Sequence, residues 1–327
     1  MNEAGLKELL SPDYMMDQLR VVYEMMESHI RDFPHLAFQP HYQQHSDGSV
    51  KALLSIDLLA ERFFMNCIAR KFGPDKVAIY GEESLASDPD LRGESRICIL
   101  IDIVDGTDLL ERDFSNWCSA IVVFEPQQRK ILGSFVHLRS ERGQYLYYTT
   151  RDSRVYKKPM LLTGKSLEPQ RRSRWEQVTP LRGPAQGREL RDASVCVYGQ
   201  KSSSLLSLLS WNELDKLLSW LKAMESEKGT MQEPKFRFYN LAGNPMMVRL
   251  AEGIVDVVLD LKGQHPHDVV PGAYIALLSG AVMTKPDGDE LKIEDLADSL
   301  CLPARSAIQY VLAANKPMNK ELISLLQ

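Results

Sequence analysis

The sequence lacks the features that mark several broad classes of protein. No apolar run approaches the ~20 residues that cross a bilayer, and the acidic amino-terminal segment has no basic-then-apolar signal pattern. Lysine and arginine (39) do not outnumber aspartate and glutamate (44), so the net charge of −5 argues against general nucleic-acid affinity. The five cysteines form no CxxC pair. We therefore expect no membrane or nucleic-acid partner, buried free thiols and a reducing, cytoplasmic location.

Common catalytic patterns are missing as well. The sequence has no HExxH, no GxSxG and no Rossmann glycine pattern. Gly164-Lys165-Ser166 resembles the end of a P-loop, but Pro159 occupies the position of the required earlier glycine. The chemistry must therefore be sought in other residues.

What the sequence does contain is an alternation of helical and strand patterns, in a chain of 327 residues that exceeds the usual size of one core. Apolar residues at three- and four-residue spacing predict helices, and short aliphatic runs predict strands. A polar stretch that includes His41 and His45 predicts a loop or hairpin. The predicted helices cover 14–32, 55–72, 204–225, 246–252 and a helix beginning at 273, and the predicted strands cover 77–80, 97–104, 119–124, 131–138, 145–149, 194–198 and 254–261.

A basic segment interrupts this alternation. Residues 151–192 hold 11 lysines and arginines against 5 acidic residues, with several prolines and glycines. A solvated connector and an electropositive flank for an anionic substrate both fit this composition. We therefore divide the chain into a first domain at 1–155, a basic connector at 156–192 and a second domain at 193–327.

The strongest local feature is the segment Ile99–Thr107, ILIDIVDGT. A buried aliphatic strand ends with Asp102 and Asp105, and Gly106 then allows a tight turn. Two acids at a strand end repel each other unless a cation lies between them, and Mg²⁺ prefers carboxylate, carbonyl and water oxygens. If a helix begins at Thr107, the N–H groups of this turn favour a phosphate. An acidic turn without a ligand is the alternative.

Glu82 follows another predicted strand in the same way, in the sequence Gly81-Glu82-Glu83-Ser84. An acidic turn alone is a weak signal, because acids are common at helix N-termini. If strands 77–80 and 97–104 are parallel neighbours, however, Glu82 and Asp102 meet at the edge of the sheet where ligands bind in α/β folds. The two turns together favour a metal site.

A third acid lies in the segment His265–Ala273, HPHDVVPGA. We expect Asp268 to be the N-cap of the helix that follows, from where it could reach a metal. The alternatives are that Asp268 only caps the helix and binds no metal, that His265 and His267 form a zinc pair, and that His267 and Asp268 form a phosphohydrolase dyad. Both histidine sites need further histidines at defined spacing, and the other five fall in no such pattern.

Taken together, these motifs resemble the inositol monophosphatase superfamily of lithium-sensitive, Mg²⁺-dependent sugar-phosphate phosphatases. GEES at 81–84, DIVDGTD at 102–108, the Asp-x-x-x-Gly of 268–272 and VLAAN at 311–315 occur in family order, and the resemblance runs from about residue 45 to the C-terminus. It implies an α/β fold built as a layered α-β-α-β-α sandwich, commonly dimeric. In this interpretation domain 1–155 binds metal and domain 193–327 completes the active site.

The resemblance also implies two to three Mg²⁺ ions and their ligands. Glu82, Asp102 and the carbonyl of Val104 would bind the first ion. Asp102, Asp105 and Asp268 would bind the second. Glu82 would also help to hold a weaker third ion.

The remaining roles implied by the resemblance concern water and substrate. Asp57, in Leu54-Ser55-Ile56-Asp57, would pair with Thr107 to orient the attacking water, with Glu82 as the third catalytic residue. Asp260 could meet a substrate hydroxyl or be an ordinary acid at a strand end. The substrate-binding residues would be Asp105, Gly106, Thr107, Asp260 and Asp268, with phosphate held by the backbone N–H groups of Gly106 and Thr107.

Two residues and one segment depart from the family pattern. His45 stands where the family has a lysine, His267 replaces the usual tryptophan, and segment 238–244 matches the glycine- and serine-rich substrate segment poorly. We therefore expect a small phosphorylated substrate, with inositol monophosphate or a related polyol or sugar phosphate favoured. Fructose 1,6-bisphosphate, a nucleoside 3′,5′-bisphosphate, or a binding protein of low activity with a regulatory role are the alternatives.

Overall fold

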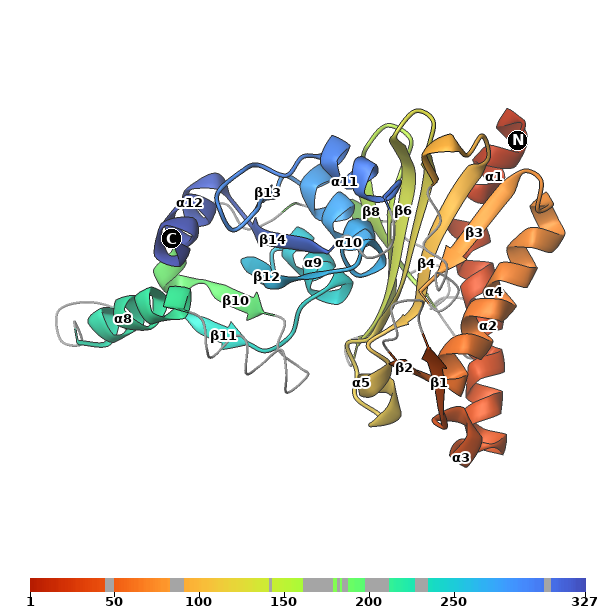
Figure 1. Ribbon diagram of the computed structural model, residues 1–327, viewed down its shortest axis with the longest axis horizontal. Helices are drawn as coiled ribbons and strands as arrows, with labels where there is room; N and C mark the ends of the chain where they lie inside the picture. The colour runs from red at the N-terminus through yellow and green to blue at the C-terminus, as the bar shows by residue number, and fades with distance from the viewer. Residues whose placement is uncertain are drawn as a thin grey trace. The chain divides into compact units, whose positions relative to one another are not determined.

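The computed structural model describes residues 1–44, 50–82, 91–140, 143–160, 179–180, 183, 188–197, 212–226, 235–302 and 307–327. The chain divides into two units, one formed by Met1–Pro180 with Ala297–Ser306 and the other by Leu181–Leu296 with Ala307–Gln327. Figure 1 colours the chain from red at its amino terminus to blue at its carboxyl terminus. None of the helices in the described ranges is both long and apolar enough to cross a membrane.

The first unit is built on a seven-stranded sheet with the order β3-β4-β5-β6-β7-β8-β9. β3 and β4 are parallel, whereas the other neighbours are antiparallel. The strands are β3 (Val77–Gly81), β4 (Ile97–Asp105), β5 (Cys118–Glu125), β6 (Lys130–Ser140), β7 (Gly143–Thr149), β8 (Val155–Pro159) and β9 (Thr179–Pro180). All five strands predicted between 77 and 149 are therefore confirmed, and the aliphatic β4 is buried from Cys98 to Val104.

Two helices, α2 (Pro12–Asp32) and α4 (Ser55–Phe72), cover one face of this sheet (Figure 1). Leu19 of α2 and Phe64 of α4 share a core with Ile99 and Ile101, whose alternate spacing on β4 places them on the same face. The two helices confirm the predictions for 14–32 and 55–72. Shorter elements complete the unit: α1 (Glu3–Leu9), α3 (Pro34–Ala37), the 3-10 turn η2 (Leu91–Gly93) and α5 (Thr107–Glu111).

The polar stretch before α4 forms a hairpin, as one of the two predicted alternatives. β1 (Pro40–Gln44) and β2 (Val50–Leu54) pair antiparallel, with His41 opposite Leu53. His45 and the rest of segment 45–49, which stands at the family's lysine position, lie outside the described residues, as do Glu83, Ser84 and Gly164-Lys165-Ser166.

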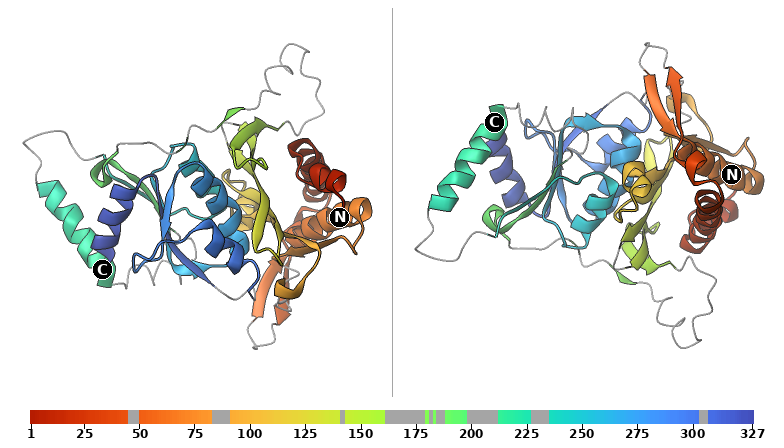
Figure 2. Two further views of the ribbon diagram at one scale, coloured as in Figure 1. Left: turned by 90° about the horizontal axis from the view of Figure 1, so that it is seen from above. Right: turned by 90° about the horizontal axis from the view of Figure 1, so that it is seen from below.

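The second unit contains a five-stranded sheet with the order β11-β10-β12-β14-β13. Figure 2 shows α8 and α12 on one face of this sheet and α9 and α10 on the other. Val195, Val257 and Val311, on three adjacent strands, pack against Leu217 of α8 and Leu322 of α12. The elements are η3 (Leu190–Asp192), β10 (Ser194–Val197), α8 (Asn212–Ser226), β11 (Arg237–Tyr239), α9 (Asn244–Ala251), β12 (Val257–Gln264), α10 (Pro266–Leu278), β13 (Val282–Thr284), β14 (Ile308–Ala313) and α12 (Lys316–Leu326). The helix α11 (Ile293–Ser299) begins in this unit, and its residues from Ala297 onward belong to the first unit.

Most predicted elements of this unit are confirmed, with shifted ends. β10 and α9 match their predictions, and α8 matches 212–225 of the predicted helix 204–225, whose first residues lie outside the described ranges. The strand predicted at 254–261 begins only at Val257. Gly253, with φ at +76°, forms a turn after α9, so the chain becomes extended later than its apolar pattern indicates.

The predicted start of α10 and the predicted capping role of Asp268 are wrong. The helix begins at Pro266, its N-cap is His265, and Asp268 is its third residue. Proline suits the first helical position, because an N–H there would have no helical partner and the φ of proline is already helical. The carboxylate of Asp268 is therefore not used as an N-cap.

One short segment returns from the second unit to the first. Within Ala297–Ser306, the Sγ of Cys301 lies 3.9 Å from the carbonyl oxygen of Pro126, and Asp298 forms an exposed ion pair with Arg129 at 3.2 Å. Cys301 is also one of four buried cysteines, and all five cysteines are free, as the sequence predicts.

Candidate active site

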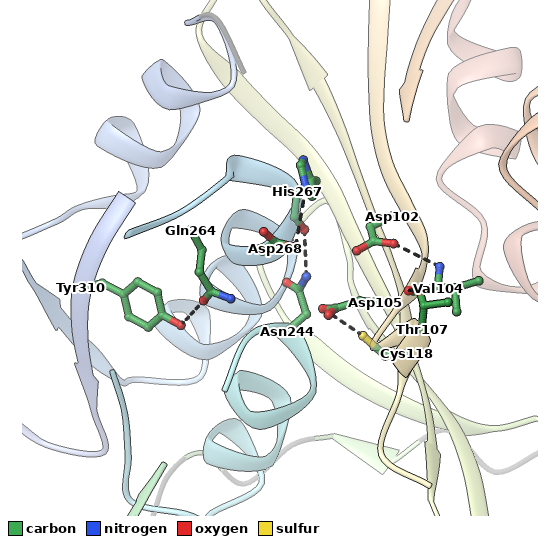
Figure 3. Close-up of polar contacts among 10 residues, drawn as sticks. All are labelled: Asp102, Val104, Asp105, Thr107, Cys118, Asn244, Gln264, His267, Asp268 and Tyr310. Atoms are coloured by element: carbon green, nitrogen blue, oxygen red, sulfur yellow. Dashed lines mark hydrogen bonds and ion pairs between the residues drawn. The ribbon is translucent and has the colours of Figure 1, made fainter. Parts of the chain in front are cut away.

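The two acids at the end of β4 lie side by side. Asp102 and Asp105 each offer a carboxylate oxygen within 4.8 Å of the other. Asp102 is 5% exposed, and its Oδ1 accepts a hydrogen bond from the N–H of Val104 at 3.1 Å. The thiol of Cys118 points toward Oδ2 of Asp105 at 3.7 Å (Figure 3). Two carboxylates this close repel each other, so a bound cation would stabilise their charged forms.

The turn after β4 is fixed by Gly106. Its φ of +101° suits glycine, and a Cβ at this position would lie 3.1 Å from the Cβ of Trp117. The helix α5 starts at the next residue, Thr107, as expected if the turn feeds a helix. The structure therefore confirms the strand–turn–helix arrangement predicted for this segment.

Thr107 connects this turn to α4. Its Oγ1 lies 3.0 Å from Oδ1 of Asp57 and 3.0 Å from the carbonyl oxygen of Val104, so both acceptors lie within reach of its single proton. Asp57 lies in the first turn of α4, 50 residues earlier in the chain. The pair of residues that the resemblance implied is therefore in direct contact.

Glu82 lies next to the end of β4 through the parallel pairing of β3 and β4. Gly81 is paired with Ile101, and the N–H of Glu82 donates to the carbonyl oxygen of Ile101 at 3.1 Å. Glu82 and Asp102 are the residues immediately after this pair, so both follow the same rung of the sheet. The sequence prediction of parallel neighbouring strands is confirmed.

Glu61 is an acid of this region that sequence reasoning missed. It lies four residues after Asp57, on the same face of α4, and is 4% exposed. Its carboxylate occupies the space where a side chain at position 81 would begin, which explains the glycine there. Its spacing from Asp57 was the available signal, but only the fold shows its contact with the end of β3.

In the second unit, Asp268 lies in the first turn of α10. Its Oδ1 is 3.6 Å from Nε2 of the preceding residue, His267, which is 4% exposed. The ring of His267 stacks on His265 with centroids 5.5 Å apart. The first turn of α10 thus presents an acid beside a buried imidazole.

Asn244, which sequence reasoning also missed, holds this turn in place. Pro271 has no N–H, so the carbonyl oxygen of His267 loses its usual helical donor four residues later. The side chain of Asn244, which is fully buried in α9, supplies that donor at 2.8 Å, and its Oδ1 accepts from the N–H of Gly272 at 2.7 Å (Figure 3). One amide thus replaces the donor that Pro271 lacks and makes a second hydrogen bond to the backbone of α10. Pro271 inside a helical segment was the sequence signal for such a partner.

Asp260 lies near the end of β12 and is 2% exposed. Its Oδ1 accepts from the N–H groups of Lys262 at 2.7 Å and Gly263 at 2.6 Å, which fixes the bend in the strand. Burial raises the pKa of this carboxyl, and the two backbone donors oppose that rise. Among the described residues Oδ2 has no hydrogen-bond partner. The contacts of Oδ1 show a strand-end role, and the substrate role stays a prediction.

Comparisons with known proteins agree with this arrangement. A model of the inositol monophosphatase family matches residues 16–326. No curated protein matches the sequence. Among solved structures, inositol monophosphatase II of Staphylococcus aureus is 16% identical with a TM-score of 0.60, and the match covers 95% of this chain and 92% of that one.

Two further structures show the same fold. An IMPase of Thermotoga maritima is 16% identical with a TM-score of 0.59, covering 96% of this chain and 95% of that one. An IMPase/NADP phosphatase in complex with Mg²⁺ and phosphate is 14% identical with a TM-score of 0.59, covering 96% of each chain. The fold class is therefore α/β with layered helices and sheets, as predicted. Because the family match spans nearly the whole sequence, this chain belongs to the inositol monophosphatase family.

Proposed function

We propose that this chain is a Mg²⁺-dependent phosphatase that hydrolyses a small phosphate monoester by attack of water. Membership of a family of phosphatases supports the reaction class. The observation that supports the mechanism most directly is the hydrogen bond from Thr107 to Asp57 at 3.0 Å, beside the acids at the end of β4. The same hydroxyl also contacts the carbonyl of Val104.

The donor atoms at the end of β4 suit Mg²⁺. Asp102 and Asp105 supply hard carboxylate oxygens within 4.8 Å of each other, and a cation between a buried and a half-buried carboxylate would offset their repulsion. In this proposal Glu82, Asp102 and the carbonyl of Val104 hold one ion, and Asp102, Asp105 and Asp268 hold a second, with Asp268 included on the family pattern. When bound, such ions acidify a water and neutralise charge on the phosphate.

Thr107 and Asp57 then handle the proton of the attacking water. When the Thr107 hydroxyl donates to Asp57, its oxygen keeps lone pairs that can accept a proton from a water at the phosphorus. As that water attacks, one of its protons passes to Oγ1 of Thr107, and the Thr107 proton passes to Oδ1 of Asp57. The 3.0 Å contact is within the reach that general base catalysis requires.

Phosphate release with and without Mg²⁺ tests this proposal. We expect Asp102→Asn and Thr107→Ala to lower kcat by about 10²–10⁴-fold, because each removes a ligand or a proton acceptor. Thr107→Ser keeps the hydroxyl and should retain most of the activity. Asp113→Asn is the matched control, because Asp113 is exposed and its φ of +56° suits asparagine. Undiminished turnover after chelation would refute the proposal.

The substrate is proposed to be a polyol or sugar phosphate, with inositol monophosphate first. Structures of S. aureus IMPase II hold inositol monophosphate or 2′-AMP, and the IMPase/NADP phosphatase was also solved with NADP and Ca²⁺. The panel should therefore contain these three compounds, fructose 1,6-bisphosphate and a nucleoside 3′,5′-bisphosphate. Tight binding of a panel member without hydrolysis of any would favour the low-activity binding protein instead.

A further inference from the structure

Three buried polar side chains form a hydrogen-bonded chain inside the first unit. Tyr23 of α2 is 1% exposed, and Ser119 of β5 and His137 of β6 are fully buried. The Tyr23 hydroxyl lies 2.5 Å from Oγ of Ser119 and 2.7 Å from Nδ1 of His137. Ser119 in turn donates to the carbonyl oxygen of Ile103 at 2.5 Å. The mechanism described above uses none of these side chains.

This chain of hydrogen bonds ends where the sheet is irregular. Asp102 pairs with Ala120 and Asp105 with Cys118, so the register advances three residues along β4 but two along β5. Ile103 lies inside this bulge, between Asp102 and Val104. A bulge disturbs the regular ladder and changes the direction of side chains, and it is common beside active sites. The hydroxyl of Ser119 supplies the bulged carbonyl with a donor.

The donors and acceptors can be assigned from chemistry alone. A carbonyl oxygen only accepts, so Ser119 must use its proton on Ile103. Tyr23 must then donate to Ser119, and Nδ1 of His137 must carry the proton that it donates to Tyr23. Nε2 of His137 has no hydrogen-bond partner among the described residues, which fits the neutral Nδ1–H tautomer. Every donor of the network therefore points toward β4.

The network is also held firmly by its surroundings. The ring of Tyr23 packs edge-on against Trp117, with centroids 5.7 Å apart, and the guanidinium of Arg139 lies 4.9 Å from the Trp117 ring. Ser119 and His137 are cross-strand partners on β5 and β6. Each member thus has contacts with elements other than β4, so the network ties the bulge of β4 to α2, β5 and β6.

We propose that Tyr23 and Ser119 are positioning residues that hold the bulge of β4, and through it Asp102 and Val104, in the geometry that binds the divalent ion. This inference rests on the proposed function. Groups that orient metal ligands without touching the metal commonly change metal affinity or activity by about 10–100-fold when they are removed. Ser119 acts here on the peptide between two proposed ligands rather than on a ligand side chain.

A titration with Mn²⁺, followed by loss of the EPR signal of the free ion, tests this inference without relying on turnover. We expect Ser119→Ala to bind Mn²⁺ about 10–100-fold more weakly than the wild type, and Tyr23→Phe to show a smaller loss in the same direction. Ser119→Thr keeps the hydroxyl and should restore binding. Ser134→Ala is the matched control: Ser134 is also fully buried, and its Oγ lies 3.5 Å from the carbonyl of Ile121, away from the bulge.

The outcomes separate the inference from the function on which it rests. Wild-type protein that neither binds Mn²⁺ nor hydrolyses any phosphate ester would overturn the proposed function. If the wild type binds Mn²⁺ and both Ser119→Ala and Ser134→Ala bind it with the same affinity as the wild type, the positioning role alone would be overturned. If Ser119→Ala does not fold, Tyr23→Phe decides: weakened Mn²⁺ binding with a native circular dichroism spectrum supports the role, and wild-type binding refutes it. A fall in kcat with little change in KM should accompany weakened binding.

Discussion

Replacing Asn244 with alanine should remove both hydrogen bonds that its side chain makes to the backbone of α10. The carbonyl of His267 and the N–H of Gly272 would each lose the hydrogen bond that Asn244 makes to it, and losing one partner of a buried hydrogen bond costs about 1–3 kcal/mol. We therefore expect Asn244→Ala to lower the free energy of unfolding by about 2–6 kcal/mol. Asn244→Asp should not restore stability, because its second carboxylate oxygen would face the carbonyl oxygen of His267 in a buried site, acceptor against acceptor.

The mechanism is tested by adding Pro271→Ala to this variant. An alanine at 271 supplies the N–H that the helix lacks, and this N–H can donate to the carbonyl of His267. Asn244→Ala should therefore cost about 1–3 kcal/mol less in the Pro271→Ala background than in the wild type. Urea denaturation of the four proteins in the cycle gives this coupling directly. Additive effects, within about 0.5 kcal/mol, would refute our account of the asparagine.

Two further predictions concern the first unit. Burial, and then the charge of Arg139, lowers the pKa of His137 from 6.5 to about 3. The unfolded chain therefore binds a proton that the folded chain excludes, so the free energy of unfolding should fall by up to about 1.4 kcal/mol per pH unit as the pH drops below about 6.5. His137→Gln should reduce this pH dependence, measured by urea denaturation. An unchanged dependence would contradict the lowered pKa of His137. Gly81→Ala should cost about 1–3 kcal/mol and weaken Mn²⁺ binding, because the new methyl group meets the Glu61 carboxylate. Gly93→Ala is the control, because a Cβ at position 93 would have no atom within 4 Å. Equal urea midpoints for the two variants would exclude the clash with Glu61.

The sequence predicted the parts of the site that depend on local pattern. The aliphatic run of β4 is buried as expected, and its two acids and glycine turn follow it directly. The parallel pairing that places Glu82 beside the end of β4 could be predicted from two successive strand signals. The contact between Asp57 and Thr107 came from the family resemblance, because nothing local links residues 50 positions apart.

The parts that could not be predicted depend on contacts between distant residues. Tyr23 and His137 are 114 positions apart, and neither has a neighbour in sequence that indicates a polar network. The start of α10 was misplaced because Pro266, Pro271 and Gly272 all lower helix propensity. Asn244, 28 residues before Gly272, supplies the donor that Pro271 lacks, and such a contact with a neighbouring helix cannot be predicted from local preference.

The return of Ala297–Ser306 to the first unit has a consequence for synthesis on the ribosome. Neither unit is a continuous piece of chain, so the first unit still lacks one of its segments after residue 180 has been made. Cys301 and Asp298, which contact Pro126 and Arg129, are added more than a hundred residues later. The first unit therefore cannot assemble completely until nearly the whole chain has been translated. A gene cut at the first unit boundary would yield a fragment without its final segment.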